Sequence, residues 1–239
     1  MKVIYSKRYN INLGLLNYLH PFDGVKFQSI YDGLKKNKGI DFDEPSDVVS
    51  MDIIDEFLSS IMQHRVRNKN GIFQALEVPR IPFISFSFLD RKILTPMRWG
   101  VAGTIVGATQ ALKNSGVYWN LSGGYHHAMQ QNMEGFCIYN DVGICHQHLI
   151  NGGLLAPDDK ILIIDTDAHH GNGNARTFID NDKIKILDVY NESIYPLTHF
   201  LLGNTTVTNN TLQITISVLF LDIVDYTKDF NSTDLGDRQ

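Results

Sequence analysis

Residues 165–173 read Asp-Thr-Asp-Ala-His-His-Gly-Asn-Gly, directly after the apolar run Ile-Leu-Ile-Ile at 161–164. A short apolar run of this kind predicts a buried strand of a parallel sheet. In open parallel sheets, ligands bind beyond the carboxyl ends of the strands, which is where this polar cluster falls. Asp165, Asp167 and His169 alternate along an extended segment, so their side chains share one face and can converge. Two carboxylates and an imidazole suit a divalent metal of zinc type.

A pair of histidines follows a second predicted strand. The run at 117–121 ends in Ser-Gly-Gly-Tyr-His-His at 122–127. Adjacent histidines on one loop can face the same cleft, where one acts as a general base while the other stays charged. Each cluster alone has a plainer explanation, as a polar turn or as surface histidines. Together, at two strand ends, they predict one catalytic hollow.

The rest of the chain alternates between apolar runs and helical spacing. The expected strands are 2–5, 81–88, 117–121, 160–165, 185–189 and 214–221, and the expected helices are 24–36, one beginning at Ser46, 101–114 and 138–150. This alternation predicts an α/β fold, with a parallel sheet and helices on both of its faces. We expect a single domain over residues 1–239.

Composition narrows the function. The chain has 21 basic and 26 acidic residues, a net charge of -5, and no cluster of Lys or Arg, so we expect no nucleic-acid partner. Cys137 and Cys145 are its two cysteines, which fits a reducing compartment rather than a disulfide framework. The first ten residues lack the apolar core of a signal peptide, and no apolar stretch approaches the roughly 20 residues of a spanning helix. These features predict a soluble, cytoplasmic (intracellular) protein with no membrane association.

Four motifs resemble the histone deacetylase and acetylpolyamine amidohydrolase family. They are SGGYHHA at 122–128, GFC at 135–137, DTDAHHGNG at 165–173 and ILDVYNESIYP at 186–196. The segments VIYSKRYN at 3–10 and LHPFD at 19–23 are similar to class IV histone deacetylases in particular. The resemblance covers residues 1–196, whereas 197–239 are divergent or truncated. It implies an arginase/deacetylase-like, three-layer parallel sheet whose C-terminal part is incomplete here.

The resemblance implies two metal sites. Asp167 and His169 match two of the three ligands of a catalytic Zn²⁺ ion, and Asp234 in the polar tail is the candidate for the third. A structural K⁺ site, formed mainly by backbone carbonyls, is matched by Asp165, Asp167, His169, Asp188 and Val189.

The resemblance also implies a role for each residue around the metal. His127 matches the general base, and His126 matches its electrostatic partner. Asp165 matches the residue that orients His126, and Asn172 the residue that orients His127. Gly135 matches the floor of an acyl-lysine tunnel, and Phe136 matches an aromatic residue of its wall. An amide at position 172 can accept the Nδ1 proton of His127 but adds no charge. We therefore expect a less basic His127 than an Asp at that position would give.

The function implied is hydrolysis of the amide of acetyl-lysine, or another acyl-lysine, in a protein. A small acetylated amine is the other substrate considered. The family's oxyanion-binding tyrosine lies in a Gly-Gly-Tyr turn, and no such turn follows Tyr125. The alternative is therefore a catalytically impaired relative that binds acylated ligands or partners without turnover. A manganese ureohydrolase ranks below both, since its paired ions need more Asp residues than the cluster supplies.

Overall fold

The computed structural model describes residues 1–14, 23–191 and 193–196, and the backbone of 211–215. Its strands are β1 (Lys2–Ile4), β2 (Asp41–Asp43), β3 (Tyr118–Asn120), β4 (Ile161–Asp165), β5 (Ile184–Tyr190) and β6 (Thr211–Thr215). Its helices are η1 (Lys7–Tyr9), α1 (Lys26–Leu34), α2 (Met51–Phe57), α3 (Ser60–Arg65), α4 (Lys69–Ala75), α5 (Phe86–Leu89), η3 (Asp90–Leu94), α6 (Thr95–Asn114), α7 (Asp141–Asn151) and α8 (Asn172–Thr177). The predicted alternation of strands and helices is confirmed.

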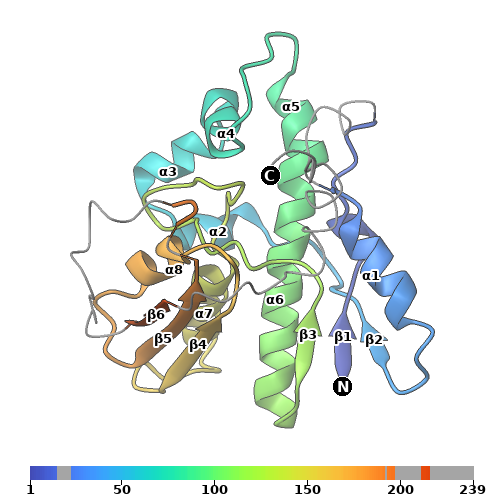
Figure 1. Ribbon diagram of the computed structural model, residues 1–239, viewed down its shortest axis with the longest axis vertical. Coiled ribbons are helices and arrows are strands. Elements are labelled where there is room, and N and C mark those ends of the chain that lie inside the picture. The colour runs from blue at the N-terminus through green and yellow to red at the C-terminus, as the bar shows by residue number, and fades with distance from the viewer. Residues whose placement is uncertain (15–22, 192, 197–210, 216–239) are drawn as a thin grey trace, which may run out of the picture.

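The described strands form two sheets of three strands each, with the orders β2-β1-β3 and β4-β5-β6 (Figure 1). Every pairing within them is parallel, as predicted. Among the described residues the two sheets do not join into one. The strand predicted at 214–221 overlaps the end of β6, which stops at Thr215, and its remaining residues lie outside the described part of the chain.

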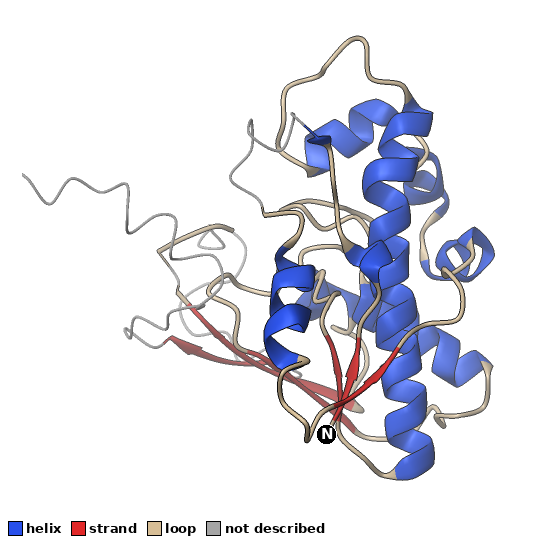
Figure 2. Ribbon diagram, turned by 90° about the vertical axis from the view of Figure 1, so that its right-hand side faces the viewer, coloured by secondary structure: helices blue, strands red, loops and turns tan. Residues whose placement is uncertain are grey.

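Helices cover both faces of the first sheet. Val3 of β1 packs in one cluster with Phe27 of α1, whereas its neighbour Ile4 lies beside Gly107 of α6. Successive side chains on a strand point to opposite faces, so α1 and α6 must lie on opposite sides of β1. Figure 2 shows the two helices flanking these strands. The strands of this sheet therefore lie between helices.

The second sheet is covered on one face by the described residues. Ile161 and Ile163 of β4 pack with Phe178 and with Val142 of α7. Leu162 and Ile164 point the other way and are 61% and 60% exposed. The described residues therefore leave one face of the run at 161–164 exposed, and the expected cover on both faces stays a prediction.

The prediction of a strand at 81–88 is wrong. Residues 81–85 form a turn, and α5 begins at Phe86. Ser85 caps that helix by accepting the backbone N–H of Phe88 at 3.2 Å, and Phe83 is 97% exposed. Pro82 lacks the N–H that a ladder needs, so the apolar run cannot continue as a central strand.

The structure corrects two predicted helix starts. Ser50, not Ser46, caps α2 through the N–H of Ile53. The helix predicted at 101–114 begins earlier, because α5, the π-helical turn η3 and α6 run on continuously from Phe86. Pro96 near the start of α6 has no N–H to donate backwards, which fits a local π turn before it. No described helix combines the length and apolar character that crossing a membrane requires.

Candidate active site

The loop after β3 rests on a glycine of α6. A side chain at Gly100 would place its Cβ 2.6 Å from the Ser122 hydroxyl oxygen and 2.7 Å from the Tyr125 hydroxyl oxygen. Only a residue without a Cβ allows this approach. The strand end and the histidine pair that follows are thereby set against the long helix.

Asp141, at the start of α7, holds the same loop from the other side. Its carboxylate accepts the backbone N–H groups of Tyr125 at 2.8 Å and Gly124 at 3.1 Å, and the Thr104 hydroxyl at 2.7 Å. The residue is 2% exposed, so water does not replace these bonds. Asp141 therefore fixes the backbone just before His126.

Replacing Asp141 with alanine should lower the free energy of unfolding by about 2–5 kcal/mol, because buried N–H donors lose their acceptor. Chemical denaturation monitored by fluorescence and circular dichroism would measure this loss. Asp141→Asn is the matched control, since it keeps one acceptor oxygen and should lose less. Equal stability of the alanine variant and the wild type would contradict this role.

The loops after β3 and β4 meet at the histidine pair. His126 Nδ1 lies 2.8 Å from Asp165 Oδ2, and His127 Nδ1 lies 2.7 Å from Asn172 Oδ1. The backbone N–H of Asn174 in α8 donates to the His126 carbonyl at 3.0 Å. The structure thus brings together the two polar clusters that the sequence placed at separate strand ends.

The two histidines have different environments. Burial alone would lower the pKa of His126, but its hydrogen bond to Asp165 and the charges of Asp165 and Asp167 outweigh burial and raise it. Burial, aided by the charge of His126, lowers the pKa of His127 to about 4, although the hydrogen bond with Asn172 acts in the opposite direction. His127 is therefore neutral and His126 is more readily charged near neutral pH. This division suits a base beside an electrostatic partner.

Asp167 and His169 form the second part of the site. Asp167 Oδ1 lies 2.9 Å from His169 Nδ1 and 3.7 Å from His126 Nε2. Burial alone would raise the pKa of Asp167, but hydrogen bonds from His169 and the charge of His126 lower it to about 2. The side chains of Asp167 and His169 remain 38% and 45% exposed, so both reach open space.

These two side chains fit part of a zinc site. A carboxylate and a neutral imidazole are common zinc ligands, and bonds of about 2.0–2.2 Å place two tetrahedral ligand atoms roughly 3.3 Å apart. The 2.9 Å between Asp167 Oδ1 and His169 Nδ1 is a hydrogen-bond distance, roughly 0.4 Å shorter than that spacing, so Nδ1 would exchange its proton for the metal and the pair would open slightly. Across the described ranges no group of three His, Cys, Asp or Glu residues could hold a metal. Asp234, the expected third ligand, lies outside the described residues.

Asp188 lies behind this pair, opposite Asp165 in the pairing of β4 with β5. It is fully buried, and its Oδ2 accepts the Gly171 N–H at 2.9 Å. Its Oδ1 has no hydrogen-bond partner among the described residues. Burial and the charge of Asp165 raise the pKa of Asp188 to about 7. Such a carboxyl group needs either a proton or a nearby cation.

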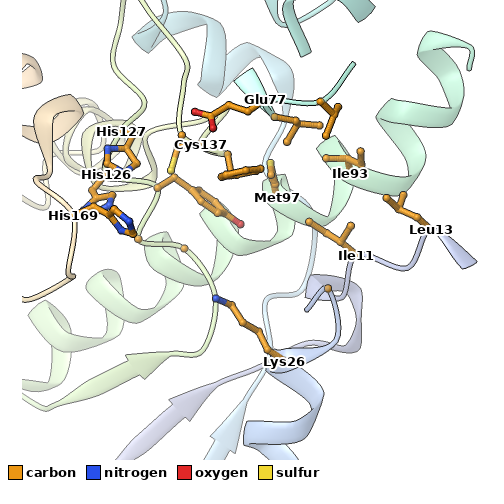
Figure 3. Close-up of a pocket in the computed structure, with 18 of the residues that line it drawn as sticks. Ile11, Leu13, Lys26, Glu77, Ile93, Met97, His126, His127, Cys137 and His169 are labelled. Carbon is orange, nitrogen blue, oxygen red and sulfur yellow. The ribbon is translucent and has the colours of Figure 1, made fainter. Parts of the chain in front are cut away.

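A cavity of about 1060 Å³ opens beside the histidines (Figure 3). His126, His127 and His169 lie at one end, and Ile11, Leu13 and Ile93 lie at the other. The apolar side chains of its wall include Phe73, Leu76, Val78, Ile81, Ile84, Phe88 and Met97. The site therefore joins a polar, ionisable end to a long apolar space.

Gly135 and Phe136, to which the resemblance gives tunnel roles, are among the residues that line this cavity. A Cβ on Gly135 would lie 2.5 Å from His127 Cδ2 and 3.0 Å from Tyr195 Cε1. Gly135 has φ +54°, which also favours glycine. Its lack of a side chain lets the imidazole and the tyrosine ring lie together, with their centroids 5.2 Å apart.

Sequence reasoning misses two residues of the site. Tyr195 stands in the quoted motif at 186–196, but nothing in its spacing indicates that it reaches His127. Glu134 directly precedes Gly135, and its carboxylate accepts from the side-chain amide of Asn172 at 2.6 Å. The sequence feature that could have pointed to Glu134 is its place directly before the GFC motif at 135–137.

Comparisons with known proteins agree with the quoted motifs. The histone deacetylase domain model matches residues 20–231. Histone deacetylase 2 of Arabidopsis thaliana is 30% identical over 208 residues, which are 83% of this chain and 51% of that protein. The acetoin utilization protein AcuC of Bacillus subtilis is 35% identical over 96 residues, 40% of this chain and 24% of that protein. The chain spans about half the length of the Arabidopsis relative.

Proposed function

The chain belongs to the histone deacetylase family, and from this premise we propose that it is a zinc-dependent deacylase acting on acyl-lysine in proteins. The observation that carries the proposal is the set of four side chains at one end of the apolar cavity: His126, His127, Asp167 and His169. They combine a neutral imidazole, a second imidazole beside a carboxylate, and an adjacent carboxylate and imidazole of the types that bind zinc.

In this proposal Asp167 and His169 would hold a zinc ion. Zinc held there would polarise the amide carbonyl and lower the pKa of water towards about 7. His127 removes the proton from the attacking water through Nε2, because its Nδ1 faces Asn172 Oδ1. The same imidazole then returns that proton to the leaving amine. His126, held by Asp165, supplies positive charge beside the reacting carbonyl.

The cavity supports an acylated substrate. Gly135, Phe136 and Tyr195 line it beside the histidines, where the amide would lie, and the apolar wall suits hydrocarbon rather than a charged group. An acyl-lysine has a neutral amide between two aliphatic segments. A protein side chain is the proposed substrate, with a small acetylated amine as the other candidate of the same chemistry.

Three further proposals concern the surroundings of the site. A K⁺ ion near Asp188, bound by carbonyls of Asp165, Asp167, His169 and Val189, would neutralise the buried carboxylate. A three-layer arrangement would extend over both sheets and cover the face of β4 that carries Leu162 and Ile164. An intracellular location remains a prediction from the sequence.

Metal analysis combined with turnover tests the function. Purified protein should contain zinc and hydrolyse a fluorogenic acetyl-lysine peptide, and a chelator should remove both until zinc is restored. The expected result is loss of turnover on chelation and its recovery with zinc but not with magnesium, because zinc prefers nitrogen and carboxylate ligands. Two manganese ions per chain would instead indicate ureohydrolase chemistry.

A binding function without turnover is the second candidate. The observation that favours it is the number of metal ligands. Catalytic zinc normally has three protein ligands, whereas the described residues supply two. Folded protein that binds an acetyl-lysine peptide but contains no zinc and releases no acetate would establish this alternative. A weak zinc site with slow turnover would keep the enzymatic function.

A further inference from the structure

Glu134 accepts hydrogen bonds from two side-chain amides at once. Its Oε1 receives the Nδ2 group of Asn172 at 2.6 Å, and its Oε2 receives the Nδ2 group of Asn132 at 2.7 Å. On the far side, Asn132 Oδ1 accepts from the guanidinium of Arg65 in α3 at 2.9 Å. On the near side, Asn172 Oδ1 lies 2.7 Å from His127 Nδ1. A continuous row of polar contacts therefore runs from Arg65 to His127.

The direction of every bond in this row is fixed by its charged members. A carboxylate can only accept, so each amide must turn its NH₂ group towards Glu134. A guanidinium can only donate, so Asn132 must turn its oxygen towards Arg65. With its NH₂ group held by Glu134, Asn172 has only its carbonyl oxygen left for His127. The Nδ1 atom of His127 must then carry the proton and donate it.

We infer that Glu134 is a positioning residue that sets the tautomer of His127 by fixing the orientation of the Asn172 amide. This inference rests on the proposed function for its consequence: with the proton on Nδ1, the Nε2 lone pair is free to accept a proton from water. A flipped amide would present NH₂ to Nδ1 and move the imidazole proton to Nε2. His127 could not then act as a base.

This row also explains how an amide can serve beside the base. A carboxylate at position 172 would accept through either oxygen and would need no orientation. An amide has one accepting end and one donating end, so it needs a partner that selects between them. Glu134 provides that selection, and Arg65 with Asn132 holds Glu134 in turn. The negative charge of this row is on Glu134, with the Asn172 amide between it and His127. A carboxylate at position 172 would instead place the charge directly against His127.

The tautomer of His127 can be measured directly. Metal-free protein with ¹⁵N-labelled histidine would be examined by NMR at pH 7, where His127 is neutral, and its signals would be assigned by their loss in His127→Gln. The wild type should show a single Nδ1–H tautomer. Glu134→Leu should show the Nε2–H form or a mixture. Retention of the pure Nδ1–H tautomer in folded Glu134→Leu protein would overturn the inference.

Two double variants separate orientation from packing and charge. Asn172→Asp added to Glu134→Leu should restore the Nδ1–H tautomer, because the new carboxylate accepts whichever way it turns. Asn132→Asp combined with Glu134→Gln should also keep it, because the new glutamine can accept from Asn172 while it donates to the new carboxylate at position 132. Loss of the tautomer in either double variant would count against the inference. If Glu134→Leu alone does not fold, Glu134→Gln alone decides the matter. Asn132 donates to the glutamine oxygen, so the glutamine NH₂ should face Asn172, flip its amide and shift His127 to the Nε2–H tautomer; retention of pure Nδ1–H would overturn the inference.

Kinetics with zinc-loaded protein provides the second readout. Glu134→Leu should lower kcat by about 10–100-fold with little change in KM, and Asn172→Asp should recover most of the loss. A change in KM alone, with kcat unchanged, would overturn the inference. Wild-type protein that lacks turnover would refute the proposed function, whereas the tautomer measurement would still decide the role of Glu134.

Discussion

Replacing His127 with alanine is expected to lower kcat for an acetyl-lysine peptide by about 10²–10⁴-fold, the usual contribution of a general base. The imidazole is buried, its Nδ1 is engaged by Asn172, and it is the one proposed to take the proton from water. KM should change little, because the ring contributes to the reaction more than to binding. Steady-state kinetics with zinc-loaded protein would measure the effect.

The pH dependence of this step follows from the environment of His127. A general base works in its neutral form, so the rate falls as the pH drops through its pKa. Because burial and the charge of His126 lower that pKa to about 4, wild-type kcat/KM should hold from neutral to weakly acidic pH. His64→Ala, which changes an exposed histidine of α3, is the matched control and should leave the profile unaltered. For the substitution described above, a wild-type kcat in His127→Ala would show that His127 is not the general base.

Replacing Asp167 with alanine should abolish stoichiometric zinc binding and, with it, turnover. The variant removes one of the two proposed ligands among the described residues and leaves His169 without its carboxylate partner. Loss of a residue that only supports a metal ligand costs about 10–100-fold in affinity, so loss of a ligand should cost more. Zinc titration against a competing chelator would give the affinity, and the peptide assay would give the rate.

The matched control for this variant is Asp182→Ala, because Asp182 is exposed, pairs with Lys183 and does not line the cavity. That protein should retain zinc and turnover. Circular dichroism should show that Asp167→Ala stays folded, since its side chain is partly exposed. Full zinc occupancy in folded Asp167→Ala protein would mean that the metal binds elsewhere.

The approach of the two polar clusters could be predicted from their places at the ends of two parallel strands, although the described β3 and β4 lie in separate sheets. Short apolar runs at 117–121 and 161–164 became β3 and β4, and polar residues directly after parallel strands gather at the carboxyl ends. The prediction for the run at 81–88 failed, because hydrophobicity does not separate a strand from a turn and a short helix. Pro82 and the capping Ser85 decided that segment.

The contacts of Glu134 could not be predicted from the sequence. Its partner Asn172 is 38 residues away, and the contact depends on how the turn at 135–136, closed by the bridge between Glu134 and Cys137, places the Glu134 side chain against α8. The same holds for Tyr195, whose approach to His127 depends on the space left at Gly135. Motif spacing identifies residue types near a site, but side-chain direction across two loops is set by packing.

The meeting of the two loops has a consequence for the newly made chain. His126 and His127 are synthesised 39 and 45 residues before Asp165 and Asn172, so they leave the ribosome without their partners. The first sheet can assemble while both imidazoles still face water. The proposed chemistry therefore begins only when the second sheet docks.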